Sequence, residues 1–185
     1  MKATDLLKRQ HRDVEKLFKA LENATPAKKS EIFEELASSL VAHDAIEREI
    51  FYPACEEAMG MGDELGEALV EHGVVEFSLY QAEQSAGKGD FNFKCAVLKE
   101  IVEHHVEEEE KEFFPKVEKA LSAEQLKDLA MQMEERFEEA RDEDFRGPLH
   151  SNLKQVLAGA LKPGKVRPAS KERFISKQRK ARKSA

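Results

Sequence analysis

The stretch HDAIEREIFYP at residues 43–53 has a counterpart in HVEEEEKEFFP at residues 105–115, and the offset between the two is 62 residues. Each stretch begins with a histidine and has a glutamate four residues later, which is Glu47 in the first and Glu109 in the second. Each then ends in two aromatic residues followed by a proline. Two segments with the same residue types at the same spacing indicate an internal repeat.

A second pair of segments extends the repeat toward the N-terminus. His11 and His72 both begin the pattern H-x-x-V-E, which ends at Glu15 and Glu76, and the offset here is 61 residues. Each half of the chain therefore carries one histidine–glutamate pair of each kind. We expect two helical hairpins of similar layout, which together form a bundle close to two-fold symmetry.

The composition favours helices throughout the chain. Of the 185 residues, 36% are charged and 41% are hydrophobic, with 9 glycines, 6 prolines and no tryptophan. Such a composition argues against a β-sandwich or a collagen-like chain. No apolar run approaches the roughly 18 residues that span a membrane, and the charged N-terminus contains no secretion signal. Cys55 and Cys95 are too few for a disulfide framework, so we expect a cytoplasmic protein.

Signals for helix starts and stops divide the chain into six helical segments. Thr4 is expected to cap the first, Pro26 lies in the first turn of the second, and Ser122 and Gln125 form a capping box for the fifth. The expected helices cover residues 5–23, 25–59, 63–86, 92–120, 122–142 and 151–161. The linkers between the first four are short, so neighbouring helices should run antiparallel.

We therefore expect an all-α protein with an up-down-up-down four-helix bundle over residues 1–121. A C-terminal helical extension should cover residues 122–161, and a flexible basic tail should follow over residues 162–185. Residues 161–185 contain ten lysines and arginines and one acid, Glu172, although the whole chain has a net charge of −7. The body of the protein is therefore acidic and its C-terminal arm is basic.

The repeated histidines and glutamates occupy helix positions that should face the core. The stripe on the second helix, for example, runs through Leu36, Leu40, His43 and Glu47 at alternating steps of three and four residues. Burial of one unpaired carboxylate costs several kcal/mol, whereas a domain is stable by only about 5–15 kcal/mol. The buried polar groups therefore need a common partner, and a metal centre in the bundle core is the simplest one.

The spacing indicates which kind of metal centre to expect. A histidine and a glutamate four residues apart face the same side of a helix, about one turn apart, so both can reach one centre. Ferritin-like bundles use Glu-x-x-His instead, and none of the six histidines has an acid three residues before it. Four histidines with several carboxylates exceed the ligand set of one zinc ion. They suit two ions, for which we expect iron, with manganese or a mixed pair left open.

These motifs resemble hemerythrin-like proteins of the HHE cation-binding type, and the resemblance covers roughly residues 4–120. It implies a four-helix bundle that holds a non-haem di-iron centre with an oxo or hydroxo bridge. It implies Glu47 and Glu109 as bridging carboxylates and an open position that takes O₂, NO or peroxide. The terminal ligands that it implies are His11, His43, His72 and His105.

Two departures from the oxygen-carrying members of that family affect the expected ligands. Their third helix has His-x-x-x-His, whereas the second member here is Glu76, and their fourth helix has an aspartate five residues after its histidine, whereas Glu109 lies at four. Glu76 as an anionic ligand would favour ferric iron and weaken reversible O₂ carriage. Glu15 is its counterpart in the repeat and is a further candidate ligand.

Other residues near the motifs carry weaker expectations. Asp44 is a candidate partner for a ligand histidine, and His104 should face outward. Tyr52 is expected to pack rather than to take part in redox chemistry. Pro53 and Pro115 lie within helices and should distort them just past each histidine–glutamate pair.

Three classes of function fit these residues. The first is a di-iron protein that senses, stores or scavenges O₂, NO or peroxide. The second is an enzyme on the same centre that consumes peroxide or reduces NO, so the chain is not assigned as an enzyme or as a non-enzyme. The third is a regulator in which the basic tail contacts a partner, and nucleic acid is the less favoured partner because a solubilising tail is the simpler explanation. The oligomeric state is left open.

Overall fold

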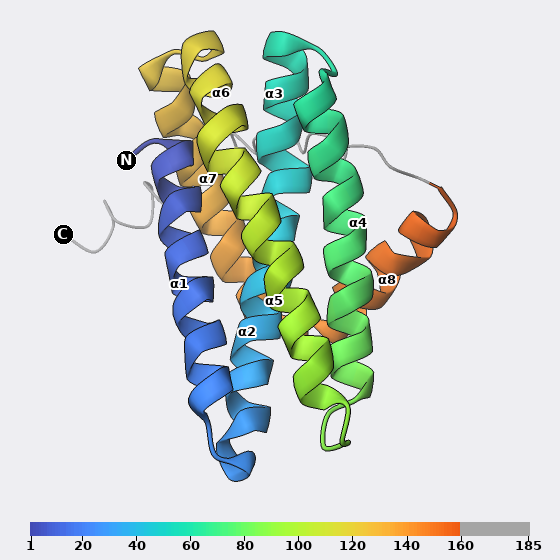
Figure 1. Cartoon of the computed structure of the whole chain (residues 1–185). Coiled ribbons are helices and arrows are strands. Elements are labelled where there is room, and N and C mark those ends of the chain that lie inside the picture. The colour runs from blue at the N-terminus through green and yellow to red at the C-terminus, as the bar shows by residue number, and fades with distance from the viewer. Residues whose placement is uncertain (160–185) are drawn as a thin grey trace, which may run out of the picture.

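The computed structural model describes residues 1–159, and this part of the chain consists of helices and short connections with no strand (Figure 1). The prediction of an all-helical bundle is confirmed. Two of its four long rods are single helices, α1 (Ala3–Asn23) and α4 (Asp63–Gln84). The other two are each built from three consecutive pieces: α2 (Pro26–Ile46), η1 (Glu47–Phe51) and α3 (Tyr52–Met59), and then α5 (Phe91–Glu108), η2 (Glu109–Phe113) and α6 (Phe114–Ala120).

The segments η1 and η2 are π-helical, and each begins at the glutamate of the repeated motif. The backbone N–H of Tyr52 donates to the carbonyl of Glu47, five residues earlier, and Phe114 donates to Glu109 in the same way. Pro53 and Pro115 follow directly. A proline lacks an N–H and its ring clashes with the carbonyl four residues before it, so the wider π turn accommodates it within a continuous rod. The predicted distortion therefore takes the form of a π segment at each site.

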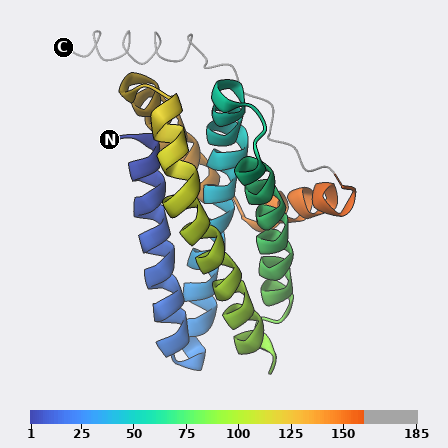
Figure 2. The same ribbon diagram turned by 45° about the horizontal axis from the view of Figure 1, so that its top comes forward.

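Consecutive rods run antiparallel, and the short connections hold them side by side (Figures 1 and 2). Helix α1 packs against α2 and α5, α4 packs against α5 and α3, and α3 packs against α6. The buried apolar residues form two clusters. One surrounds Phe51 and Phe114, and the other surrounds Phe33 and Leu98. The four repeated histidines lie in sequence between members of the two clusters, so a polar layer crosses the middle of the core.

Two further helices cover the bundle from outside. Helix α7 (Ala123–Arg141) packs against α1 and α2, and α8 (Arg146–Leu157) crosses α4 (Figures 1 and 2). The capping box of α7 is confirmed, because Ser122 Oγ accepts from the N–H of Gln125 while Gln125 Oε1 accepts from the N–H of Ser122. The apolar face of α7 belongs to the same cluster as Phe51 and Phe114.

Two predicted helix boundaries are wrong. The first helix begins at Ala3, so Thr4 is a buried helical residue whose hydroxyl donates to Glu118 across 2.6 Å, rather than a cap. The last helix covers Arg146–Leu157 instead of residues 151–161. Its earlier start includes Pro148, whose fixed φ angle is compatible with the first turn of a helix. Residue 161 and the basic tail predicted over 162–185 lie outside the described residues.

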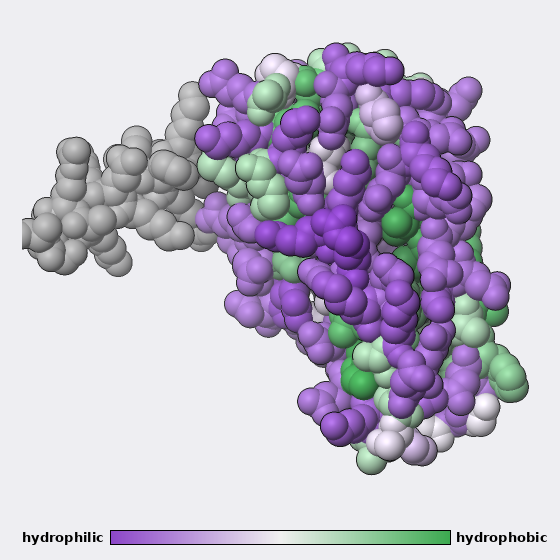
Figure 3. Space-filling model, turned by 60° about the vertical axis from the view of Figure 1, so that its left-hand side comes forward, coloured by the Kyte–Doolittle hydropathy of each residue, from purple (hydrophilic) through white to green (hydrophobic). Residues whose placement is uncertain are grey.

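The surface of the described residues is mainly polar. On the side where α1 lies, hydrophilic residues cover most of the molecule and hydrophobic residues are visible between them (Figure 3). Helix α1 places its buried residues, such as Leu7, Val14 and Phe18, on the opposite face. Within residues 1–159, none of the helices is both long and apolar enough to cross a membrane.

Candidate metal centre

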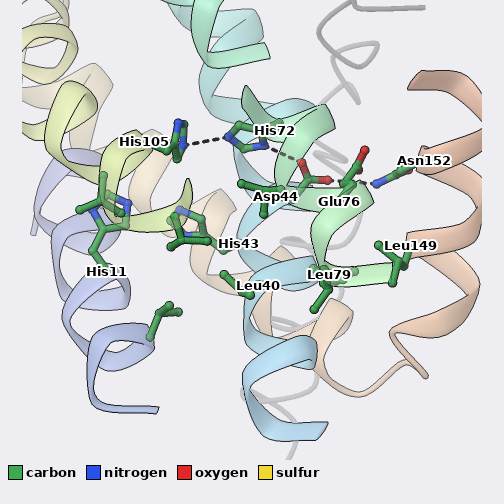
Figure 4. Close-up of a pocket in the computed structure, with 15 residues that line it drawn as sticks. His11, Leu40, His43, Asp44, His72, Glu76, Leu79, His105, Leu149 and Asn152 are labelled. Atoms are coloured by element: carbon green, nitrogen blue, oxygen red, sulfur yellow. Dashed lines mark hydrogen bonds and ion pairs between the residues drawn. The ribbon is translucent and has the colours of Figure 1, made fainter. Parts of the chain in front are cut away.

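Each rod of the bundle contributes one histidine at the same height. His11 lies on α1, His43 on α2, His72 on α4 and His105 on α5, and all four are buried. Figure 4 shows their imidazoles turned toward one another in the middle of the bundle. The antiparallel order of the rods and the internal repeat bring them together, because each histidine lies near the midpoint of its rod.

The carboxylates of Glu47 and Glu109 complete this cluster. Both residues open a π segment one turn after a histidine, and their exposed fractions are 0% and 2%. Glu47 Oε2 lies 3.2 Å from His43 Nε2 and 3.2 Å from His72 Nε2. Glu109 Oε2 lies 3.5 Å from His11 Nε2 and 3.6 Å from His105 Nε2. Each carboxylate therefore reaches histidines from both halves of the repeat.

The donor atoms fall into two overlapping groups that could each hold a metal ion. One group consists of His11, His43, Glu47 and Glu109, and the other of Glu47, His72 and His105. Within each group one ligand atom from every residue lies within 4.8 Å of the others. Glu47 belongs to both groups, which is the arrangement expected of a carboxylate shared by two ions.

The other ring nitrogen of every histidine has its own acceptor. These contacts join His11 Nδ1 to Glu110 (2.8 Å), His43 Nδ1 to Gln10 (2.8 Å), His72 Nδ1 to Asp44 (2.6 Å) and His105 Nδ1 to Glu71 (2.7 Å). An acceptor at Nδ1 fixes the proton there and directs the lone pair of Nε2 inward. This pattern is typical of histidines that bind metals.

Several nitrogen and oxygen atoms that point into the centre have no hydrogen-bond partner among the described residues, so they suit a metal ion. His11 Nε2, His43 Nε2, both oxygens of Glu47 and Oε2 of Glu109 are buried and make no hydrogen bond with any described residue. Buried polar atoms of this kind are rare because they cost free energy. Ligand atoms about 2.1 Å from a shared ion lie about 3.0–3.5 Å apart, which matches the spacing given above. The residues therefore fit metal ions of imidazole and carboxylate preference.

The pKa shifts of the buried groups also support a cation site. Burial and the neighbouring charge of Glu47 raise the pKa of Glu109 to about 7. Burial lowers the pKa of His72, but the hydrogen bond to Asp44 and the nearby charge of Glu47 outweigh it and raise that pKa to about 10. Both shifts reflect the negative charge of neighbouring carboxylates, which a cation would neutralise.

Tyr52 packs in the core, as expected, and its hydroxyl also contacts the site. Its hydroxyl donates to Glu109 Oε1 across 2.9 Å and lies 2.8 Å from His72 Nε2. Burial, followed by the charges of Glu109 and Glu47, raises the pKa of Tyr52 well above its usual value. The phenol is therefore a neutral donor that orients the Glu109 carboxylate.

Glu76 is buried, but the structure does not place it with the ligand groups. Its Oε2 lies 3.2 Å from Arg48 Nη2, and burial and the charge of Asp44 raise its pKa to about 7. Asp44 Oδ1 accepts from Arg48 Nε across 2.7 Å, and Asp44 Oδ2 accepts from Asn152 of α8 across 3.0 Å (Figure 4). Glu76 thus belongs to a buried ionic cluster that supports His72 through Asp44.

Glu15 lies outside the site, so its expected role as a ligand needs correction. Its side chain is 51% exposed and accepts a hydrogen bond from Lys19 across 2.5 Å. Glu15 lies near the middle of α1, four residues after His11, but its side chain faces solvent rather than the centre. No described group that could hold a metal includes it.

An apolar pocket adjoins the four histidines. Its wall includes Val14 of α1, Leu40 and Val41 of α2, Leu79 of α4 and Val102 of α5. Helix α8 closes one side with Leu149 and Asn152, as Figure 4 shows. A pocket of this character favours small, uncharged molecules next to the centre.

Sequence reasoning missed most of the residues that support the histidines. Asp44 was expected as such a partner, but Gln10, Glu71 and Glu110 were not. Each of the four partners lies on a different rod from the histidine it contacts. Spacing along one helix therefore carries no signal for these contacts, because they depend on how the rods pack.

The fold and the site define a helical bundle whose buried histidines and carboxylates could hold a cation. Comparison with known proteins identifies the family to which this bundle belongs. The model of the hemerythrin HHE cation-binding domain matches residues 2–117, and the chain belongs to this family. The match covers every residue of the two ligand groups and all of the four rods except the last three residues of α6.

Two individual proteins are similar to the chain. A hemerythrin HHE cation-binding domain-containing protein from Mycobacterium kansasii has the same fold, with a TM-score of 0.68 and 22% identity over 86% of this chain and 94% of that one. A protein named DNA nickase from Nostoc sp. is 30% identical over 132 residues, which is 70% of this chain. The chain spans 37% of the length of that relative.

Proposed function

We propose that the protein holds two iron ions in this cluster and uses them to bind or respond to O₂, NO or peroxide. The observation that supports this most directly is the inward convergence of four Nε2 atoms on two shared carboxylates, with each Nδ1 anchored from behind. His11 and His43 would hold one ion and His72 and His105 the other. Glu47 and Glu109 would join the two ions.

When bound, the iron pair supplies redox-active ions that exchange electrons with a small oxidant. The chain's own residues prepare this chemistry. Glu71, Asp44, Gln10 and Glu110 hold the imidazoles in one orientation, and the Tyr52 hydroxyl orients Glu109. Orientation by such partners lowers the cost of arranging ligands around an ion.

The apolar pocket supports the choice of ligand class. Residues such as Leu40, Leu79 and Leu149 offer no hydrogen bonds to water or to charged metabolites. A diatomic gas is small and apolar, and its transfer into such a pocket costs little. Peroxide carries two hydroxyls, so it would depend on the polar residues of the pocket, Asp44, Glu76 and Asn152. The pocket lies directly beside the four histidines, so a ligand there would be close to the proposed ions.

The first test is to purify the full chain from iron-supplemented cells and to count its metal. We expect about two irons per chain and near-ultraviolet charge-transfer bands that bleach on reduction and return in air. Spectral change with O₂ or NO without turnover would identify a sensor or store. Rapid iron-dependent loss of peroxide would identify an enzyme. Zinc alone, with no iron uptake by the folded apoprotein, would exclude the proposal.

Nucleic acid is a second candidate partner. Two observations favour it: the similarity to a protein named DNA nickase, and the ten lysines and arginines of residues 161–185. Contacts of this kind would be sequence-independent and weakened by salt. Deletion of residues 161–185 should then abolish retention of a DNA fragment without a change in the metal count. Equal retention by the shortened chain would exclude this candidate.

A further inference from the structure

A groove beside the centre is lined by carboxylates. It runs between α4 and the end of the α5 rod, and its wall consists of Ala68, Phe113 and the side chains of Glu64, Glu67, Glu71, Glu108, Glu109 and Glu112. None of the residues that line it is a lysine or an arginine. Lys116 pairs with Glu64 at its edge. The groove is therefore strongly negative and faces solvent on one side.

The inner end of the groove is a residue of the centre itself. Glu109 lines the groove, yet its exposed fraction is 2% and its Oε2 makes no hydrogen bond with any described residue. That same oxygen lies within 3.6 Å of His11 Nε2 and His105 Nε2. Glu109 therefore lines the groove and belongs to the proposed centre, and its Oε2 itself is buried.

Next to the groove lies a second, smaller group of possible ligands, two of which, Glu71 and Glu108, also line the groove. His104 Nε2 lies 3.6 Å from Glu71 Oε1 and 3.4 Å from Glu108 Oε1, and the three side chains can offer ligand atoms within 4.8 Å of one another. The other oxygen of Glu71 accepts from His105 Nδ1 across 2.7 Å. Glu71 therefore touches both the outer group and a histidine of the centre.

The centre thus borders two hollows of opposite character. The pocket under α8 is apolar, and a hydrated cation would lose its water there without replacement, at a cost of many kcal/mol. The groove offers carboxylate oxygens, and the imidazole of His104 lies next to Glu108 at its edge. Both kinds of group can replace water around a divalent ion. Charged walls of one sign also raise the local concentration of the opposite ion.

We propose that this acidic groove is the route by which divalent iron reaches the buried centre. His104, Glu71 and Glu108 form the outer binding group on the route, and Glu109 receives the ion at its inner end. The inference rests on the proposed function, because it assumes that the centre binds iron. It assigns a role to Glu67, Glu108 and His104, which do not belong to the centre.

The test compares the rate at which the apoprotein takes up iron(II) under anaerobic conditions. Glu67→Gln combined with Glu108→Gln removes two charges from the groove and leaves Glu71 and Glu109 intact. Glu100→Gln combined with Glu135→Gln removes the same charge from exposed helix positions elsewhere. Samples are quenched with a chelator at successive times, and the protein-bound iron is counted.

We expect the groove variant to load iron roughly tenfold more slowly than the wild type at low ionic strength, with the same final iron count. The difference should shrink in high salt. The control variant should load at the wild-type rate. Equal rates in the groove variant, or equal slowing in the control, would overturn the route.

Two further outcomes separate this inference from the function on which it rests. A lower final iron count in the groove variant would make Glu67 and Glu108 part of the binding centre and would overturn their role on a route. A wild-type apoprotein that takes up no iron would overturn both the route and the proposed function. If the wild type takes up iron and the groove variant takes it up at the same rate, the route is overturned and the proposed function stands.

Discussion

His72 donates from Nδ1 to Asp44 across 2.6 Å, and this contact links the centre of the bundle to its C-terminal helix. Asp44 also accepts from Arg48 Nε across 2.7 Å and from Asn152 of α8 across 3.0 Å. One carboxylate thus orients an imidazole while two donors fix its own position. Partners behind a ligand histidine are worth about 10–100-fold in metal affinity.

We therefore expect Asp44→Ala to weaken iron binding by about 10–100-fold, measured by competition with a chelator. Asp44→Asn retains an acceptor oxygen and should lose less. Asp13→Ala, which removes an exposed carboxylate on α1, is the matched control and should bind iron normally. Wild-type affinity in Asp44→Ala would show that the contact does not support the centre.

Glu47→Gln and Glu15→Gln test the placement of the two glutamates. Glu47 is completely buried and belongs to both ligand groups, whereas Glu15 is exposed beside Lys19. Glu47→Gln should reduce iron affinity by more than the about 10–100-fold typical of a supporting partner. Glu15→Gln should leave the iron count unchanged. A loss of iron in Glu15→Gln would return that residue to the list of ligands.

Substitution of two glycines of α4 tests how closely α8 packs against that helix. A Cβ at Gly66 would meet nothing within 4 Å, so Gly66→Ala should raise the free energy of unfolding by about 0.5–1 kcal/mol through helix propensity. A Cβ at Gly73 would lie 3.0 Å from Val156. Gly73→Ala should therefore lose that gain, and its thermal midpoint should stay at or below the wild-type value. Equal stabilisation by both substitutions would mean that α8 does not pack closely against α4 at Gly73.

Removal of metal should lower thermal stability. A ligand at about 1,000 times its Kd stabilises the folded state by about 4 kcal/mol, and each kcal/mol shifts the midpoint of a chain of this size by about 2–4 °C. We expect chelation to lower the midpoint of the wild type by about 8–16 °C in calorimetry. The Glu47→Gln protein should shift much less. Equal shifts in both would attribute the effect to the chelator.

The sequence predicted the four rods and the inward position of the four repeated histidines well, because both depend on regular spacing. The repeat at an offset of 62 residues identified His43 with Glu47 and His105 with Glu109 as equivalent pairs. A period near 3.6 residues then placed each pair on the inward face. These features are local to one helix, so they can be read without knowledge of the packing.

The sequence could not distinguish Glu15 and Glu76 from the true inward carboxylates. Both lie four residues after a histidine, as Glu47 and Glu109 do, but α1 and α4 run antiparallel to the rods that carry Glu47 and Glu109 (Figure 1). Four residues along α1 or α4 therefore lead away from the histidines in the opposite direction, so Glu15 reaches solvent and Glu76 reaches Arg48. The direction of each rod decides which glutamate reaches the centre, and only the structure shows it.

Helices α7 and α8, which cover the bundle, also affect where the chain can be truncated. Leu126 and Met133 of α7 are buried in the same cluster as Leu6 and Phe114, and α8 closes the pocket beside the histidines. A chain cut at residue 117, where the family match ends, would expose apolar surface along α1 and α2 to water. We expect such a fragment to aggregate or to bind iron poorly, so the family boundary is not a safe place to truncate this protein.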